Sequence, residues 1–274
     1  MSRFAISIAF LSTVQAALVL APQRRHWPVL DALAGRAWAL APPLSLAVVI
    51  AAIALDSASA DLLTWLALVV VPPLAALALG VFGRGARPGL ALLAGPILAL
   101  AWAAEGTLGG DLAALALSAL ACVTLGAALA ELVPGRWLSL GIYAMAALDT
   151  YLVATDLLQG PNSVLVAAAP GPGLPQLQAA HVGDASLGFG DLFVAATVGA
   201  LLARHGEGAR LRGALLALAL ALSFDLLFFF VDELPATVPM AATLAAFEQL
   251  GRRRAPASRR PEPASRLSPE AQGP

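Results

Sequence analysis

The sequence predicts an all-α, polytopic membrane protein, a bundle of about nine transmembrane helices. Three observations predict it. Hydrophobic residues make up 59% of the 274 residues and charged residues only 12%, about half of the roughly 25% charge that a soluble globular chain carries. The apolar residues form long runs of Ala, Leu and Val, which favour helices over the short alternating strands of a membrane β-barrel. This composition excludes a water-soluble enzyme and a largely disordered chain.

Apolar segments of a length that crosses the bilayer, about 20 residues with a range of about 17–25, follow one another over residues 1–250. Two of them are short, and we expect interfacial residues such as Glu105 and Glu248, or local bilayer thinning, to accommodate them. In chain order the predicted segments are 4–21, 38–55, 62–82, 90–104, 111–133, 137–158, 187–203, 212–231 and 236–250.

The first segment also has features of a secretory signal peptide. Arg3 precedes an apolar stretch that ends at Ala21-Pro22. However, Arg24 and Arg25 follow at once, and positive charge at that position resists translocation. We therefore interpret the segment as an uncleaved first helix.

The arginines predict the orientation, because all 16 basic residues are Arg. One set of alternate loops, together with the segment after residue 250, holds every Arg except Arg3. Positive charge is retained in the cytoplasm, so we expect the N-terminus outside and the C-terminus inside, in a membrane of the bacterial plasma-membrane type. A separation this complete requires an odd number of crossings, which supports nine, although seven would preserve the same parity.

Two regions fall outside the predicted bundle. Residues 159–186 form the longest loop, on the outer side, and this loop is rich in Pro and Gly. Loops of this kind are either mobile or cover a site. Residues 251–274 are rich in Arg, Pro and Ser and are expected to be a disordered cytoplasmic tail, whose arginines favour anionic lipid headgroups.

Three carboxylates lie within predicted spans, where an ionised Asp costs about 2.5–3.5 kcal/mol. Asp149 lies near the middle of the sixth segment, and Asp191 follows two glycines in Gly188-Phe189-Gly190-Asp191. Asp225 lies in the eighth segment without an obvious partner, and we interpret it as a packing or folding residue. Glycines before Asp191 allow close approach by a helix, a peptide or water.

The ninth segment opens with Leu234-Pro235-Ala236-Thr237-Val238-Pro239. Two prolines four residues apart free main-chain carbonyls. Freed backbone in a membrane must face protein or a wet cavity. Beside two intramembrane Asp residues, it indicates exposed main chain that binds an extended peptide like a strand.

This combination resembles the GxGD intramembrane aspartyl proteases, the presenilin and signal peptide peptidase superfamily, including its prokaryotic members. That family has an Asp in helix six, GxGD in helix seven and Pro-Ala-Leu at helix nine. Here Asp149, the Gly188–Asp191 motif and Pro235-Ala236-Thr237 occur in the same order and the same segments, so the resemblance spans essentially the whole bundle. The chain departs from the family at Leu148, where Tyr is usual, and at Thr237, where Leu is usual.

The resemblance implies an intramembrane aspartyl endopeptidase with Asp149 and Asp191 as its catalytic pair. It also implies that Gly188, Phe189, Gly190, Pro235, Ala236 and Thr237 bind the substrate. Two close carboxyl groups share one proton, so together they can activate water and polarise a peptide carbonyl. The predicted orientation is similar to that of signal peptide peptidase, which implies type II transmembrane substrates such as remnant signal peptides.

The two carboxylates must lie at one depth. At about 1.5 Å per residue, Asp149 lies about 14 Å from Leu158 and Asp191 only about 6 Å from Leu187. Either the seventh helix begins earlier, or the sixth extends less far outward. We expect the former, with a seventh helix over about 181–203 beginning near His181.

Three other functions stay open. A prepilin-peptidase-type GxGD protease would also use membrane Asp residues, but it would cut on the cytoplasmic side. A proton-coupled transporter could use Asp149, Asp191 and Asp225 as a relay. An inactive protease homologue would preserve the motifs without activity. Under all of these alternatives we expect no metal and no cofactor, because one Cys and three scattered His form no ligand cluster, and net charge −1 gives no reason to expect nucleic acid.

Overall fold

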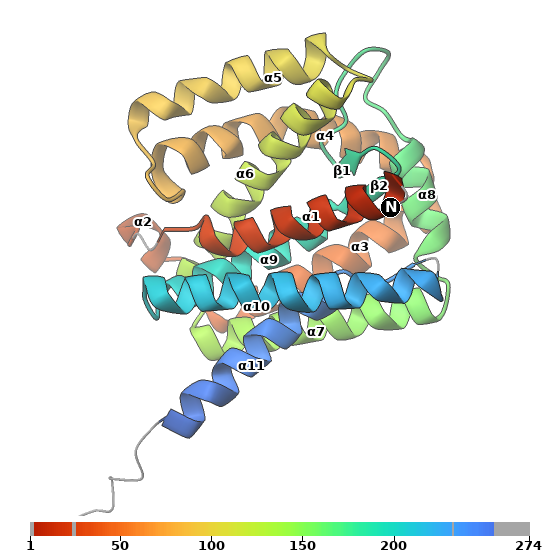
Figure 1. Ribbon diagram of the computed structural model, residues 1–274. Coiled ribbons are helices and arrows are strands. Elements are labelled where there is room, and N and C mark those ends of the chain that lie inside the picture. Colours follow the sequence, from red (N-terminus) through yellow and green to blue (C-terminus); the bar gives the residue numbers. More distant parts are fainter. Residues whose placement is uncertain (1–2, 24–25, 232, 255–274) are drawn as a thin grey trace, which may run out of the picture.

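The computed structural model describes residues 3–23, 26–231 and 233–254 (Figure 1). It is mostly helical, at 77%, with little sheet. Within the described residues, six helical stretches are long and apolar enough to cross a membrane: Arg3–Leu20, Arg36–Leu55, Ala58–Phe82, Leu108–Leu132, Gly135–Ala154 and Glu207–Phe229. Two shorter apolar stretches, Pro88–Ala103 and Phe189–Ala203, accompany them. The chain is thus a helical bundle with the composition of an integral membrane protein.

The elements follow one another along the chain with short connections. The α-helices are α1 (Arg3–Leu20), α2 (Pro28–Asp31), α3 (Ala41–Leu55), α4 (Ala58–Leu77), α5 (Ala94–Ala103), α6 (Leu108–Leu132), α7 (Gly135–Ala154), α8 (Gln159–Ala167), α9 (Phe189–Ala203), α10 (Glu207–Asp225) and α11 (Val238–Arg254). Tighter or wider turns extend some of them: 3-10 helices η1 (Arg36–Leu40), η3 (Pro88–Leu93) and η4 (Leu226–Phe229), and a π-helix η2 (Ala78–Phe82). The strands are β1 (Ala179–Val182) and β2 (Ala185–Gly188).

Every predicted apolar segment coincides with a helical stretch, although the ends differ. Helix α7 ends at Ala154 instead of residue 158, and α10 begins at Glu207 instead of residue 212. Helix α11 continues to Arg254, so residues 251–254, expected to begin a disordered tail, are helical. The remainder of that predicted tail, 255–274, lies outside the described residues.

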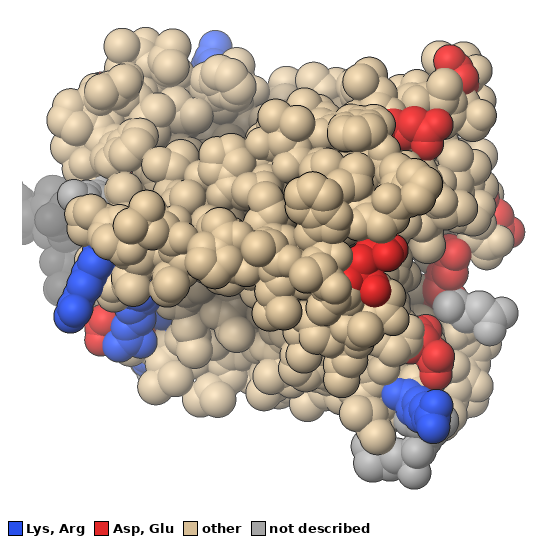
Figure 2. Space-filling view, turned by 90° about the horizontal axis from the view of Figure 1, so that it is seen from above, with Lys and Arg blue, Asp and Glu red and all other residues tan. Residues whose placement is uncertain are grey.

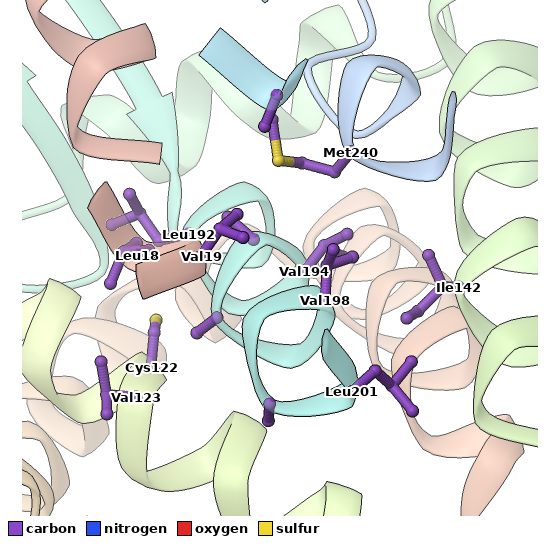
Figure 3. Packing of buried hydrophobic residues seen from close by; sticks show 14 of the residues in the cluster. Leu18, Val19, Cys122, Val123, Ile142, Leu192, Val194, Val198, Leu201 and Met240 are labelled. Atoms are coloured by element: carbon purple, nitrogen blue, oxygen red, sulfur yellow. The ribbon is translucent and has the colours of Figure 1, made fainter. Parts of the chain in front are cut away.

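Helix α9 forms the centre of the bundle. It packs against α1, α6, α10 and α11, and α6 in turn carries α4 and α5 on its other side (Figure 1). Figure 3 shows the side chains of α9 interleaved with those of α1, α6, α7 and α11. From Leu192 to Leu202 nearly every α9 residue is buried. Because most of α9 is buried, its first turn, which begins at Phe189, has a fixed position in the bundle.

The long predicted loop 159–186 is ordered by α8 and by the β1–β2 hairpin. The strands are antiparallel, with Ala179 opposite Gly188 and Val182 opposite Ala185. Gly183 occupies the two-residue turn with φ +57°, a conformation that Gly adopts readily at the first position of such hairpin turns. Strand β1 packs on α6, and β2 packs on α1 and α9.

The hairpin corrects the expected seventh helix over 181–203, because residues 179–188 are strands and α9 begins only at Phe189. The positive φ of Gly183 interrupts a helix. Glycines at 188 and 190 also cost helix propensity. Ala179, Ala180, Val182 and Ala185 of the two strands are instead buried against the neighbouring helices.

Charged residues separate along the length of the bundle (Figure 2). Most Arg atoms gather at the end where α2 and the start of α10 lie, and most Asp/Glu atoms gather at the opposite end, near α8 and the hairpin. Broad apolar surface lies between the two ends, as a helical bundle surrounded by lipid requires.

Candidate functional site

A cavity of about 870 Å³ lies within the bundle, and all three intramembrane carboxylates line it. Its walls come from α1, α3, α4, α6, α7, α8 and α10, together with the hairpin, the start of α9 and the segment before α11, and they are mainly apolar. Polar side chains are a minority of this lining. Asp149, Asp191 and Asp225 are the acidic groups among them that come from predicted spans.

Asp149 projects from the C-terminal half of α7 and is only 6% exposed. The Thr237 hydroxyl donates a hydrogen bond to its Oδ2 at 2.6 Å. Thr237 is itself 1% exposed and lies just before α11. The buried Thr237 hydroxyl thus fixes the orientation of the buried Asp149 carboxyl group.

Asp191 lies in the first turn of α9. Its Oδ2 accepts a hydrogen bond of 3.1 Å from the main-chain N–H of Gly188, so the carboxyl also caps the helix that carries it. Asp191 interacts electrostatically with Asp149 across the cavity. The structure therefore brings together the two carboxyl groups that the sequence singled out.

Local packing leaves little room for a side chain at either glycine of the Gly188–Asp191 motif. A Cβ on Gly188 would lie 3.1 Å from Oδ2 of Asp191, and a Cβ on Gly190 would lie 3.2 Å from Cε of Met145. Met145 precedes Asp149 by about one turn on the same face of α7. Small residues here let the start of α9 approach the part of α7 that carries Asp149.

The predicted substrate-binding residues gather around the same cavity. Gly188, Phe189, Gly190, Ala236 and Thr237 line it. Pro235 is buried beside them without being part of its wall. The segment before α11 is not helical, and Pro239 falls in the first turn of the helix, where its missing N–H costs nothing.

The two carboxylates reach similar depths because the sixth predicted helix is shorter than expected, and not because the seventh begins earlier. Helix α7 ends at Ala154, which leaves Asp149 about 7.5 Å from the helix end, while Asp191 lies about 3 Å from the start of α9. An earlier start of the seventh helix is therefore wrong, and a shorter sixth helix brings the levels closer. The positive φ of Asp156, +57°, marks where the chain leaves the α7 direction.

Two polar residues of this cavity were not predicted from the sequence. The Ser12 hydroxyl donates to Oδ2 of Asp225 at 2.7 Å, so Asp225 has a partner after all. Gln15 lies one turn further along α1, lines the cavity and is 3% exposed. Ser12 and Gln15 are polar residues three positions apart in an apolar segment, and this spacing could have indicated a polar patch on one face of the first helix.

Within the described part of the chain, no group of three or more His, Cys, Asp or Glu side chains could hold a metal ion. Comparison of the chain with known protein families, with curated proteins and with solved structures finds no match.

Proposed function

We propose that this protein is an intramembrane aspartyl endopeptidase that hydrolyses peptide bonds within transmembrane segments. The observation that carries the proposal is the pair Asp149 and Asp191. They come from separate helices, line one cavity and interact electrostatically. Few structural roles require two such groups inside an apolar bundle, because each charged group costs free energy there. The resemblance to presenilin and signal peptide peptidase points to the same chemistry.

The pair performs the reaction as an acid and a base. One carboxylate removes a proton from water, whose oxygen attacks the scissile carbonyl carbon, while the protonated carboxyl donates its proton to the carbonyl oxygen. The resulting gem-diol collapses as the C–N bond breaks: the leaving nitrogen takes the proton held by the protonated carboxyl, and one hydroxyl of the gem-diol gives its proton to the other carboxylate. The products are a carboxyl end and an amino end, and the pair again holds one shared proton.

The surroundings of the pair suit a peptide that has lost its helical hydrogen bonds. Strand β2 runs directly into Gly188 and lines the cavity, and the non-helical Ala236–Thr237 segment lies there too. Strand β2 is extended and the Ala236–Thr237 segment is a turn outside any helix, so the main chain at both places lies beside the cavity, where an unwound substrate could meet it. This arrangement supports the assignment of the Gly188–Gly190 and Pro235–Thr237 segments to substrate binding.

The proposal includes nine crossings, with the N-terminus outside and the C-terminus in the cytoplasm. The separation of Arg from acidic residues along the bundle supports that orientation (Figure 2). By analogy with signal peptide peptidase, the substrates are type II transmembrane peptides, including remnant signal peptides.

The decisive experiment replaces Asp149 and Asp191 separately with Asn and measures cleavage of a model type II transmembrane peptide in vesicles. Each change is expected to lower the rate about a thousandfold or more, because each removes one member of a unit that acts jointly. Asp156→Asn is the matched control, since Asp156 is exposed beyond the end of α7 and Asn tolerates its positive φ. Normal cleavage by either Asp149→Asn or Asp191→Asn would overturn the assignment.

One observation favours a second candidate function, a proton-coupled transporter. Asp225 shares the cavity with the other two carboxylates, as a relay would require. Proton flux into vesicles that is lost in Asp225→Asn, without peptide cleavage by the wild type, would select the transporter over the protease.

A further inference from the structure

We propose that Ser12, Gln15 and Asp225 form a second polar subsite of the same cavity, which binds an amide group of the peptide substrate. This subsite rests on the proposed function, since its ligand belongs to the peptide that the Asp149–Asp191 pair would cut. The three residues come from α1 and α10, which pack side by side (Figure 1). They lie on elements different from those that carry the catalytic pair.

The contacts place the three side chains together. Ser12 and Asp225 are joined by the 2.7 Å hydrogen bond from the Ser12 hydroxyl. Gln15 lies three residues after Ser12, and side chains at that spacing are neighbours on one helix face. All three line the cavity. The cluster is therefore a polar patch on the α1–α10 side of a cavity whose lining is mainly apolar.

Gln15 is the residue whose bonding needs an explanation. It is 3% exposed, and its buried Nε2 has no hydrogen-bond partner within the described part of the chain. A buried amide without a partner costs free energy that a structural residue has no reason to incur. A bound ligand with a suitable oxygen would satisfy it.

The donors and acceptors of the patch select the ligand. The Gln15 amide N–H groups need an acceptor, whereas Asp225 offers carboxyl oxygens to a donor. An ammonium or guanidinium group has only donors and would leave Gln15 unpaired. An amide has both a carbonyl oxygen and an N–H. An amide carries its acceptor and its donor on separate atoms, so we take the ligand to be an amide, either of an Asn or Gln side chain of the substrate or of its unwound main chain.

The test measures binding separately from cleavage. A labelled transmembrane peptide of Leu and Ala, and a series with one Asn moved along it, are titrated by energy transfer against protein in vesicles, in an Asp191→Asn background that leaves the peptide uncut. Asn at one position is expected to bind about tenfold more tightly than the parent peptide. Gln15→Met and Ser12→Ala are each expected to abolish that preference while the parent peptide binds as before.

Thr13→Val is the matched control. Thr13 lies on the same helix, is exposed and bonds only to the main chain of its own helix at Ala9. It should leave every affinity unchanged. The unchanged binding of the parent peptide shows that the variants remain folded.

Each outcome decides. Loss of the Asn preference alone assigns the subsite to a side-chain amide. If the Gln15 and Ser12 variants lose affinity equally for all peptides and unfold at the same thermal midpoint as the Thr13→Val protein, the subsite binds a main-chain amide. If they lose affinity equally and unfold at a lower midpoint, the subsite proposal is overturned. A preference that survives both Gln15→Met and Ser12→Ala overturns it as well.

The protease proposal is judged independently, by cleavage in the protein that retains Asp191. If that protein cuts the peptides while binding ignores Gln15 and Ser12, the protease stands and the subsite fails. If it cuts none of them while binding depends on Gln15, the patch is a peptide-binding site and the protease proposal fails.

Discussion

At the scale of single residues, Thr237 changes the meaning of a motif. The GxGD proteases that the sequence resembles carry Leu at this position, which cannot donate a hydrogen bond. Here the Thr237 hydroxyl donates to Asp149 at 2.6 Å, with both residues buried. A carboxyl group that must both hold and release a proton is sensitive to such a donor. In the proposed protease, Thr237 therefore positions Asp149, in addition to belonging to the proposed binding segment.

Replacing Thr237 by Val removes the hydroxyl and keeps the shape. We expect kcat for peptide cleavage to fall about tenfold to a hundredfold, equivalent to about 1.5–3 kcal/mol for a hydrogen bond to a charged group, while KM changes little. Thr237→Ser retains the donor and should restore most of the rate. Equal rates for Thr237→Val and wild type would contradict this role.

At the scale of elements, the hairpin between α8 and α9 positions Gly188, whose main-chain N–H donates a hydrogen bond to the Asp191 carboxyl. His181 lies in β1, and its buried Nε2 has no hydrogen-bond partner among the described residues. Burial lowers the pKa of His181, and the negative charge of Asp111 on α6 opposes that shift. Burial in the folded hairpin therefore disfavours the protonated form of His181.

The stability of the hairpin should consequently depend on pH. The unfolded hairpin takes up a proton near pH 6.5, whereas the folded one does so only at lower pH. The folded form binds fewer protons in that interval, so stability rises with pH and is lost below about pH 6.5. Hydrogen exchange at residues 179–188 should be faster at pH 5.5 than at pH 7.5, after correction for the intrinsic exchange rate at each pH. In His181→Gln the difference should vanish, and a difference that persists would assign the pH dependence to another group.

Glycines allow the helices around α9 to pack closely. A Cβ on Gly126 of α6 would lie 2.8 Å from the main-chain nitrogen of Thr197, and one on Gly199 of α9 would lie 2.6 Å from the Val19 carbonyl oxygen. Backbone atoms cannot move aside as a flexible side chain would. These two positions set the distances from α9 to α6 and α1.

Gly126→Ala and Gly199→Ala are therefore each expected to destabilise the bundle by about 1–3 kcal/mol. Gly95→Ala is the control, since a Cβ at this position in α5 would meet no heavy atom within 4 Å and Ala favours a helix. Thermal unfolding in detergent should show lower midpoints for the first two variants and an unchanged or higher midpoint for Gly95→Ala. Equal midpoints for all three would show that α9 can shift to accommodate a methyl group.

At the scale of the whole molecule, the charges give the bundle two different ends. Arg gathers at the end near α2 and the start of α10, and acidic residues gather at the end near α8 (Figure 2). The hairpin and the Asp149–Asp191 pair lie toward the acidic end, because α7 approaches its C-terminus and α9 its N-terminus there. With positive charge retained inside, peptide cleavage would occur toward the outer side of the membrane.

Reporter fusions test this orientation. A fluorescent protein that folds only in the cytoplasm should be fluorescent after Pro274. Alkaline phosphatase inserted after Ser57 should be active, because the turn at this position connects α3 to α4 at the acidic end. The reverse pattern would place the Asp149–Asp191 pair toward the cytoplasm and would favour the prepilin-peptidase type of enzyme.

The sequence alone determined the helical membrane character, the approximate helices and the candidate pair Asp149 and Asp191. Each of these depends on local properties: runs of apolar residues, and carboxylates where lipid makes charge costly. Only the tertiary structure decided that residues 179–188 form a hairpin, because Ala179, Ala180, Val182 and Ala185 are buried against helices from other parts of the chain. It alone revealed the Thr237–Asp149 bond and the Ser12–Asp225 bond, which join residues 88 and 213 positions apart. No periodicity within one segment encodes such contacts, since they arise where helices from different parts of the chain pack together.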